Sequence, residues 1–566
     1  MLTRPTSFSV FLGKPRTPRF MPSSSIRISI AHALVLAGVC FLALTPFFWH
    51  GVPSGHDFEF HMFSWMEVLG QWKQGIAYPR WAALAHWGYG EARFLFYPPA
   101  SWTLGAALGA ILPWKLVPGA YCWIALMLAG ASMYRLAREW LAARDALFAA
   151  AFYAVNPYHL VIVYWRSAYA ELLAAALLPL LLAALLRLRK SGCRPVLWVS
   201  LILAAAWLTN APAALMIHYS AAGLAVVLAV RERSWRLLAR AGLAVVLGIG
   251  LASFYLLPTI FEQNWVNIGE VLAIGVRPQD NFLFTTIADA DHNRFNLLVS
   301  YVALAEIVVM TWAMWRSRAS RLKKEPFWLL LSTWGGVTIL VMFSVSNLLW
   351  QYLPKFRFIQ LPFRWLLCLN AALGLLLAMA TRRWLTRALA AAALLAVLLL
   401  VGDRIQALWW DNASDIQEMS DAMSDGTGHE GIDEYVPAGA DPYEVNKNLP
   451  RISDASGKAV PAQMIQWGPI EKHFVVQVSE PASLTLRLFN YPAWQVTVNE
   501  RSVGTETANV TGQMLIPVAA GRSDVRIYFG RTLDRTIGDI ISMIGLVLLL
   551  AVWISTRRQN ATSPAA

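Results

Sequence analysis

Long apolar runs separated by short polar stretches occupy most of this chain. A helix needs about 20 mainly apolar residues to cross the hydrocarbon core of a membrane. Twelve runs reach or approach that length: 28–49, 119–136, 141–157, 171–186, 196–208, 212–230, 240–257, 297–315, 327–345, 363–380, 385–402 and 537–554. A further run, 100–112, is shorter than these. The pattern predicts a polytopic α-helical membrane protein with about 12–13 transmembrane segments.

The pattern changes between about 403 and 535. Hydrophobic residues there alternate with polar ones at a period of two, which is typical of strands with one buried face. The alternating positions are Phe474, Val476, Val478; Leu484, Leu486, Leu488; Trp494, Val496, Val498; and Val525, Ile527, Phe529. We expect antiparallel strands of a small β-sandwich-like domain. The first part of this region, 411–445, is acidic and predicts a linker or an irregular lobe.

These patterns divide the chain into predicted parts. We expect a cytoplasmic N-terminal segment at 1–27 and a transmembrane domain at 28–402 with an outer loop at 50–99. A β-rich extracytoplasmic domain at 403–535, a final transmembrane helix at 536–556 and a cytoplasmic tail at 557–566 follow.

Composition narrows the class of protein. Hydrophobic residues make up 57% of the 566 residues and charged residues 14%, whereas soluble domains have about 25% charged residues. This excludes a disordered chain and an ordinary cytosolic enzyme. The net charge is +13, but the basic residues cluster between apolar runs, as in cytoplasmic loops. We therefore expect no nucleic-acid partner.

Charge also predicts the orientation. Basic residues precede the run 28–49, so we expect an uncleaved first helix with a cytoplasmic N-terminus. The basic cluster at 187–194 must also be cytoplasmic, which requires one run between them to be re-entrant, and 100–112 is the best candidate. Both termini are then cytoplasmic. The outer side holds 51–99, 156–171, 258–296 with the turn 347–362 close by, and 403–535. None of the four cysteines lies in the last of these, so no disulfide framework is expected there.

The first outer loop carries the strongest candidate chemistry. It begins Gly55-His56-Asp57-Phe58-Glu59-Phe60-His61. From Phe58 onward an apolar stripe at helical spacing predicts an amphipathic helix along the membrane surface. A carboxylate at Asp57 could take a proton from a hydroxyl group or hold a divalent cation against a phosphate. The alternative is an Asp that only caps the helix.

These residues resemble those of a known superfamily. A first helix followed at once by an acidic outer loop resembles the GT-C superfamily of polytopic glycosyltransferases, which use lipid-phosphate-linked sugars. More closely, the chain resembles a bacterial family of membrane proteins related to YfhO, part of which is known as 6-pyruvoyl-tetrahydropterin synthase-related membrane proteins. The matching motifs are Gly55-His56-Asp57 with Tyr97-Pro98-Pro99; Asn156-Pro157 with Arg166 and Glu171; Leu208-Thr209-Asn210-Ala211-Pro212; Tyr255-Leu256-Leu257-Pro258; 356–365; Tyr491-Pro492-Ala493-Trp494; and 517–521.

The resemblance implies roles for these residues. Asp57 would be the base or a ligand of Mg²⁺ or Mn²⁺, with Glu59 or His61 assisting. Arg166 and Glu171 lie on the second outer turn, where relatives carry another functional acidic residue, although an ion pair that only staples this turn is an equal alternative.

A basic cluster on the outer side is an exception to the excess of basic residues in cytoplasmic loops. Lys355, Arg357 and Arg364, with Gln360 and two prolines holding a turn, predict a site for a lipid phosphate. The alternative is snorkelling to lipid headgroups. Asp289, Asp291 and His292 could hold a cation, but a solvated loop is the favoured interpretation.

Taken together, these features predict an integral glycosyltransferase in the bacterial cytoplasmic (inner) membrane. It would move a sugar from a polyprenyl-phosphate donor to an envelope glycan, lipid or protein acceptor at the outer face. The alternatives are a non-catalytic transporter, flippase or assembly factor for envelope glycans, or a structural anchor. Helix interiors that are mostly apolar favour surface chemistry over transport.

Overall fold

The computed structural model describes residues 28–190, 192–318 and 325–562, and side chains as far as Ile554. The predicted N-terminal segment 1–27 and residues 563–566 of the predicted tail lie outside this part. Within it, nine helices are long and apolar enough to cross a membrane, two further helix pairs are apolar enough together but sharply bent, and Arg194–Thr209 is a shorter apolar helix. Together these elements match the twelve apolar runs of the sequence, so the predicted polytopic helical fold is confirmed.

The first half of the bundle and the outer layer precede residue 235. The bundle helices are α1 (Ile30–Ala43), α2 (Phe47–His50), α7 (Val117–Ala137), α8 (Ala143–Ala154), α9 (Pro157–Val161), α10 (Tyr169–Ala174), α11 (Leu177–Arg187), α12 (Arg194–Thr209) and α13 (Ala211–Glu232). The outer layer consists of β1 (Val52–Pro53), α3 (Phe58–Lys73), α4 (Ala85–Gly88), α5 (Arg93–Phe96) and α6 (Pro99–Gly109).

The second half of the bundle contains both bent pairs. Its helices are α14 (Trp235–Leu251), α15 (Ser253–Glu262), α16 (Ala290–Ser317), α17 (Pro326–Val341), α18 (Asn347–Tyr352), α19 (Leu366–Ala380), α20 (Trp384–Ile405) and α22 (Leu533–Thr562). The chain bends by 76° between α14 and α15 and by 93° after α17. The first bend turns the short helix α15 toward the outer layer, where it contacts α5.

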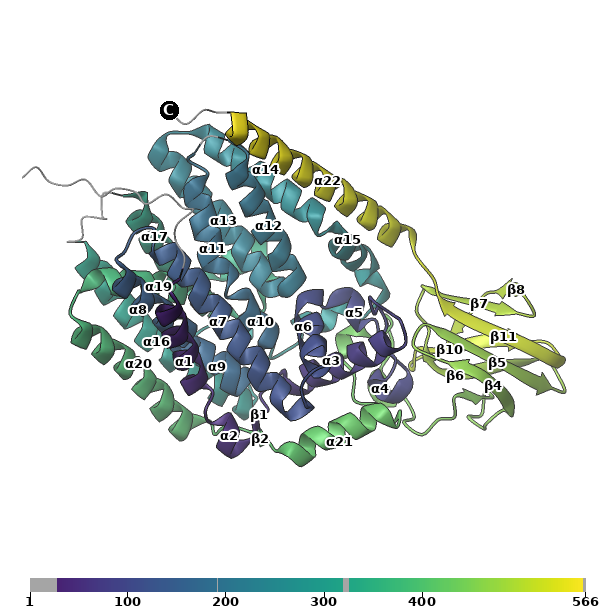
Figure 1. Ribbon diagram of the computed structural model, residues 1–566. Helices are drawn as coiled ribbons and strands as arrows, with labels where there is room; N and C mark the ends of the chain where they lie inside the picture. Colours follow the sequence, from purple (N-terminus) through teal and green to yellow (C-terminus); the bar gives the residue numbers. More distant parts are fainter. Residues whose placement is uncertain (1–27, 191, 319–324, 563–566) are drawn as a thin grey trace, which may run out of the picture.

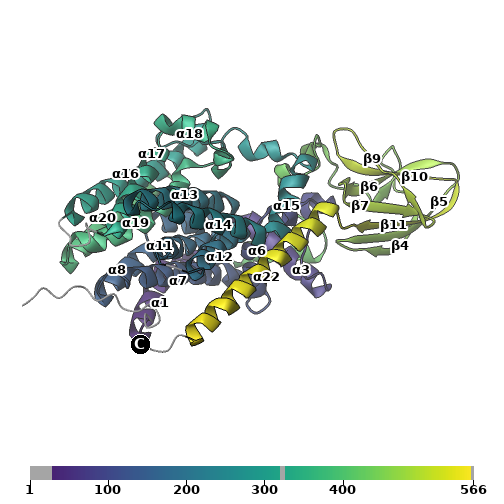
Figure 2. The ribbon, with the colours of Figure 1, turned by 90° about the horizontal axis from the view of Figure 1, so that it is seen from above.

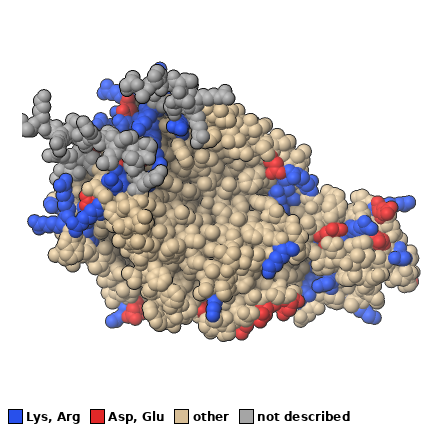
Figure 3. Space-filling model, in the orientation of Figure 1, with Lys and Arg blue, Asp and Glu red and all other residues tan. Residues whose placement is uncertain are grey.

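The basic loops gather at one end of the bundle. Arg187 pairs with Glu139, Arg189 lies 3.1 Å from Glu232, and Arg387 lies 2.6 Å from Asp145. These pairs join loops that are far apart in the sequence. On the face shown in Figure 3, Lys and Arg are densest at the end away from the β-rich region, and the middle of the face is largely uncharged. This separation follows the charge asymmetry of membrane proteins.

The short run at 100–112 forms part of the outer layer. It becomes α6, whose 11 residues rise only about 16 Å, too little to cross a core of about 30 Å. α6 packs against α3, and a Cβ on Gly105 would overlap the indole ring of Trp65. α3 is the helix predicted from the apolar stripe, but both of its faces are covered: Ser64 and Gln71 are as buried as Met62.

The β-rich region forms a two-sheet sandwich beside the outer layer (Figure 1). One sheet has the order β3-β6-β10-β9 and the other β4-β5-β11-β7-β8, with antiparallel pairing throughout. The strands are β3 (Ile452–Ser453), β4 (Ala462–Trp467), β5 (Glu471–Val478), β6 (Ala482–Phe489), β7 (Trp494–Val498), β8 (Arg501–Val503), β9 (Glu506–Thr507), β10 (Gln513–Val518) and β11 (Gly521–Phe529). The alternating residues of β5, β6, β7 and β11 share one core, which confirms the predicted sandwich.

Two connections fix this region to the membrane domain. Before the sandwich, β2 (Trp410–Asp411) pairs with β1, and α21 (Ala413–Ser424) lies against α3. After the sandwich, α22 runs back along α14 and α12 (Figure 2). At the junction, Arg535 donates to both carboxylate oxygens of Glu262 at 2.7 and 2.8 Å, and the Tyr491 hydroxyl donates to Glu262 at 2.5 Å.

Candidate functional site

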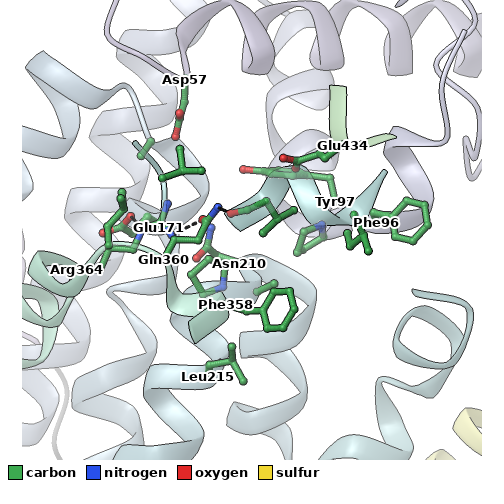
Figure 4. A pocket seen from close by; sticks show the side chains of 18 of the residues that line it. Asp57, Phe96, Tyr97, Glu171, Asn210, Leu215, Phe358, Gln360, Arg364 and Glu434 are labelled. Carbon is green, nitrogen blue, oxygen red and sulfur yellow. Dashed lines mark hydrogen bonds and ion pairs between the residues drawn. The ribbon is translucent and has the colours of Figure 1, made fainter. Parts of the chain in front are cut away.

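A cavity of about 830 Å³ lies between the outer layer and the neighbouring ends of the bundle helices. Side chains from distant parts of the chain line it, and Figure 4 shows how ten of them are placed. The polar lining residues that the argument uses are His56, Asp57, Arg166, Glu171, Lys355, Gln360, Arg364 and Glu434. The cavity therefore brings Asp57 of the first outer loop together with Arg364 of the turn 356–365, as the sequence predicted.

Backbone contacts set the position of Asp57. Its N–H donates to the carbonyl of Arg166 at 2.9 Å, and the N–H of Gly55 donates to the Ser167 hydroxyl at 3.0 Å. That hydroxyl donates onward to the carbonyl of Pro53 at 2.9 Å. Asp57 stands at the N-cap position of α3, but its side chain makes no capping hydrogen bond. Its carboxylate instead points into the cavity.

A buried network of charges forms the wall beneath Asp57. Glu171 accepts from Arg166 at 2.6 Å and from Arg364 at 3.1 Å through the same oxygen. The hydroxyl of Tyr158 donates to the other oxygen at 2.8 Å. All three charged residues are less than 10% exposed. Arg166 and Glu171 do form the predicted pair, but Arg364 joins it, so two guanidiniums share one carboxylate.

The turn before Arg364 supplies the remaining predicted polar groups. Arg364 donates to the carbonyl of Ile359 at 2.8 Å and to the side-chain oxygen of Gln360 at 2.9 Å. Gln360 also donates to the carbonyl of Val271 at 2.8 Å. Lys355 lines the cavity, whereas Arg357 is exposed and lies outside the lining. The structure thus separates two residues that the sequence placed in one phosphate site.

The other half of the cavity is apolar. Leu215 and Phe358 line it opposite Asp57 (Figure 4). Ile249 and Ile260 also line it and are 42% and 58% exposed. The cavity therefore joins a charged chamber to an apolar side.

Sequence reasoning assigned no role to His56 or Glu434, which both belong to the lining. His56 lies beside Asp57 with its ring edge-on to Phe295, at 4.8 Å between ring centroids. Desolvation, together with Arg166 and His292, lowers the pKa of His56. Glu434 enters from the segment before the sandwich, and desolvation is the main cause that raises its pKa to about 7. His56 belongs to the motif Gly55-His56-Asp57, whereas no local sequence pattern indicated a functional role for Glu434.

Glu59 and His61 lie outside the cavity lining. Glu59 is exposed, and desolvation with Asp411 and Glu430 nearby raises its pKa. His61 is 1% exposed and packs among aromatic rings, including that of Tyr169 at 5.2 Å between centroids. Burial lowers the pKa of His61 to about 4, so its ring is neutral near pH 7. A role for either residue in assisting Asp57 stays a prediction.

The acidic groups do not form a ready cation site. Within residues 28–190, 192–318 and 325–562, no three His, Cys, Asp or Glu side chains are placed to hold one metal ion. Asp289 instead caps α16, accepting from the N–H groups of Asp291 and His292 at 2.9 and 3.2 Å. The donor set does not fit a cation held by three protein ligands, and a requirement for Mg²⁺ or Mn²⁺ stays a prediction.

The fold and the cavity define a polytopic membrane protein with a charged chamber at one end of its bundle. Residues 94–408, more than half of the chain, match the family model described as "6-pyruvoyl-tetrahydropterin synthase related domain; membrane protein". The chain belongs to this family, and the family predicted from the sequence motifs is confirmed. A comparison with curated proteins found no match.

The solved structures that are similar to this chain include an arabinofuranosyltransferase and an oligosaccharyltransferase. The chain is similar to the arabinofuranosyltransferase AftD from Mycobacteria, with a TM-score of 0.42 and 17% identity over 66% of this chain and 28% of that chain. It is also similar to the oligosaccharyltransferase of Archaeoglobus fulgidus, with a TM-score of 0.38 and 12% identity over 71% of this chain and 56% of that chain. In both cases this chain spans less than two thirds of the other protein.

Proposed function

We propose that this protein is an integral membrane glycosyltransferase of GT-C type. It transfers a sugar from a polyprenyl-phosphate donor to a hydroxyl group of an envelope glycan, lipid or protein at the outer face of the bacterial cytoplasmic membrane. The observation that carries the proposal is one cavity in which Asp57 faces a buried pair of guanidiniums and which has an apolar side.

The charge of the network supports binding of a phosphate. Within the described residues, Arg166 and Arg364 share Glu171 as their one carboxylate partner at ion-pair distance. The charge of Asp57 also acts on both guanidiniums. When Asp57 takes up a proton in the proposed reaction, one buried positive charge needs a new partner, because burying an unbalanced charge is costly. A phosphate monoanion or dianion offers the acceptor oxygens that guanidinium groups match, and the apolar side of the cavity suits the polyprenyl chain.

The proposed reaction is a displacement at the anomeric carbon of the sugar. The acceptor oxygen forms a bond to that carbon, and the bond from the carbon to the phosphate oxygen breaks with its electron pair going to the phosphate. Asp57 takes the proton of the acceptor hydroxyl. Arg364 and Arg166 stabilise the charge that grows on the leaving phosphate, which is usually a large contribution to such a reaction.

The test uses the full-length protein in proteoliposomes with radiolabelled polyprenyl-phosphate hexoses and pentoses. A hydroxyl-bearing glycolipid serves as the acceptor, and transferred sugar is counted. Asp57→Asn should lower the rate by about 100-fold or more, as expected for loss of a general base. Glu418→Gln, an exposed change on α21, is the matched control and should leave the rate unchanged.

Two outcomes would contradict the proposal. One is a folded Asp57→Asn protein that transfers sugar as fast as the wild type. The other is wild-type protein that translocates labelled lipid without forming a product, which would favour the carrier alternative. Arg364→Gln should weaken donor use more than Arg357→Gln, because only Arg364 lines the cavity. Adding EDTA, Mg²⁺ or Mn²⁺ to the same assay tests the predicted cation.

A further inference from the structure

We propose that Glu434 is a substrate-binding carboxylate that receives hydrogen bonds from the hydroxyl-bearing acceptor. This inference rests on the proposed function and adds a residue from the C-terminal region to the site. Glu434 lies in the 429–440 segment, which precedes the sandwich and comes after the last bundle helix before it, α20. The helical domain alone would then form an incomplete site.

The first outer loop holds one edge of the 429–440 segment. His429 donates its N–H to the carbonyl of Leu84 and accepts from the N–H of Trp87, both at 3.1 Å. Further along, the N–H of Ile432 donates to the carboxylate of Glu91 at 2.7 Å. Although burial raises the pKa of Glu91, Arg93 and His86 lower it to about 2, so this acceptor stays ionised near pH 7.

A second outer loop holds the other edge. Asn267 donates its N–H to the carbonyl of Val436 at 3.1 Å, and the N–H of Ala438 donates to the carbonyl of Trp265 at 3.0 Å. The side chain of Asn267 accepts from the N–H of Gly439 and donates to the carbonyl of Ala440, both at 2.8 Å. The segment is therefore fixed between two outer loops that are far from it in the sequence.

This fixation turns Glu434 into the cavity. Glu434, with its neighbours Ile432 and Tyr435, belongs to the lining, and the Tyr435 ring stacks on Phe96 at 5.9 Å between centroids. In Figure 4, Glu434 and Asp57 flank the same hollow, while Arg364 lies on another side and Leu215 at the apolar end. A donor phosphate at Arg364 would put the sugar in the middle and the acceptor hydroxyl between the two carboxylates.

In the described part of the chain, no cation stands among the groups that act most strongly on Glu434. Those groups are Asp57, Glu91 and Asp433, which are all acidic, and the side chain of Tyr435, which makes a hydrogen bond with Glu434. A desolvated carboxylate without a cation is unfavourable unless hydrogen bonds compensate it, and Tyr435 supplies one such bond. Both oxygens of an ionised carboxylate accept hydrogen bonds, and hydroxyl groups of a sugar or glycolipid are donors that a lipid tail or a phosphate dianion lacks.

The experiment compares Glu434→Gln and Glu434→Asp with Glu430→Gln, an exposed change on the same segment. In the proteoliposome assay, Glu434→Gln should raise the acceptor KM about tenfold, the loss expected for a charge-assisted hydrogen bond. Protection of the purified protein against heat by polyprenyl phosphate should be unchanged. Glu434→Asp should recover part of the acceptor binding, and Glu430→Gln should match the wild type.

The pH profile separates binding from a structural role. At low acceptor concentration, wild-type transfer should rise as the pH passes about 7, because Glu434 ionises there, and this rise should be absent in Glu434→Gln. A Glu434→Gln protein with the wild-type KM and pH profile would overturn the inference while leaving the proposed function intact. So would loss of protection by polyprenyl phosphate in that variant. Absence of transfer by the wild type itself would instead contradict the proposed function.

Discussion

At the scale of single residues, one carboxylate binds both arginines that line the cavity. Glu171 receives both Arg166 and Arg364 and is 1% exposed. The sequence allowed two interpretations of the Arg166–Glu171 spacing, a staple or a functional pair. The structure contains the ion pair and also places both residues in the lining, and a functional role for the pair stays a prediction.

We expect Glu171→Gln to destabilise the protein by about 3–5 kcal/mol, the usual cost of removing one partner of a buried ion pair. Two guanidiniums would then lie close together without their shared carboxylate. The measurement is thermal unfolding of purified protein in detergent. Asp291→Asn removes a pair whose partners are 79% and 62% exposed, and it should leave the unfolding temperature unchanged. Equal unfolding temperatures for the two variants would contradict this account of Glu171.

At the scale of elements, a very short strand and a turn hold Asp57 in place. β1 pairs with β2, and the chain then approaches the π-helical turn η3 (Ile162–Arg166) so closely that only glycine fits at position 55. A Cβ on Gly55 would lie 2.4 Å from the carbonyl oxygen of Trp165. The residue after the turn, Ser167, has a left-handed backbone with φ of 49°.

We therefore expect Gly55→Ala to lower sugar transfer at least tenfold, because the backbone that carries Asp57 must move away from Arg166, and small displacements of catalytic groups cost this much or more. Gly70→Ala on α3 is the matched control. A Cβ there meets nothing within 4 Å, and alanine favours a helix over glycine, so activity should be retained. Unchanged transfer by Gly55→Ala would show that this close approach does not position Asp57.

Helices and strands with strong periodicity could be predicted from the sequence. Segments that are shaped by contacts with distant parts of the chain could not. Apolar length marks spans, so the bundle helices matched their predicted runs. Alternation marks strands, so β5, β6, β7 and β11 were found. The 429–440 segment has neither signal: backbone hydrogen bonds to two distant loops shape it, and Glu434 became visible only when the cavity was described. His61 and Arg357 belong to the predicted motifs, but His61 is buried among aromatic rings and Arg357 is exposed, and neither lines the cavity.

At the scale of the whole molecule, the basic loops and the sandwich lie at opposite ends of the bundle (Figures 1 and 3). Ion pairs such as Arg189 with Glu232 join the basic loops to one another. The positive-inside rule then predicts that these loops are cytoplasmic and that the cavity and the sandwich are outside. The proposed substrates depend on this orientation, because lipid-linked sugars must reach the cavity from the outer leaflet.

The native cysteines give a direct test of the orientation. Cys193 in a basic loop is exposed, whereas Cys40, Cys122 and Cys368 are buried. A membrane-impermeant maleimide should label the wild type only after the membrane is permeabilised. A variant with Ser483→Cys, an exposed position on β6, should be labelled in intact spheroplasts when Cys193 is replaced by Ser. Labelling of Cys193 in intact spheroplasts would reverse the orientation and contradict the proposed function.

The double attachment of the 429–440 segment has a consequence for protein engineering. A chimera that exchanges the sandwich with that of a relative should be joined after residue 440, so that Glu434 and its backbone partners in the recipient are inherited together. A junction at the end of α20 would replace the 429–440 segment, and with it one side of the cavity, by the sequence of the relative. The new segment would then have to form its backbone hydrogen bonds with two loops of the recipient protein.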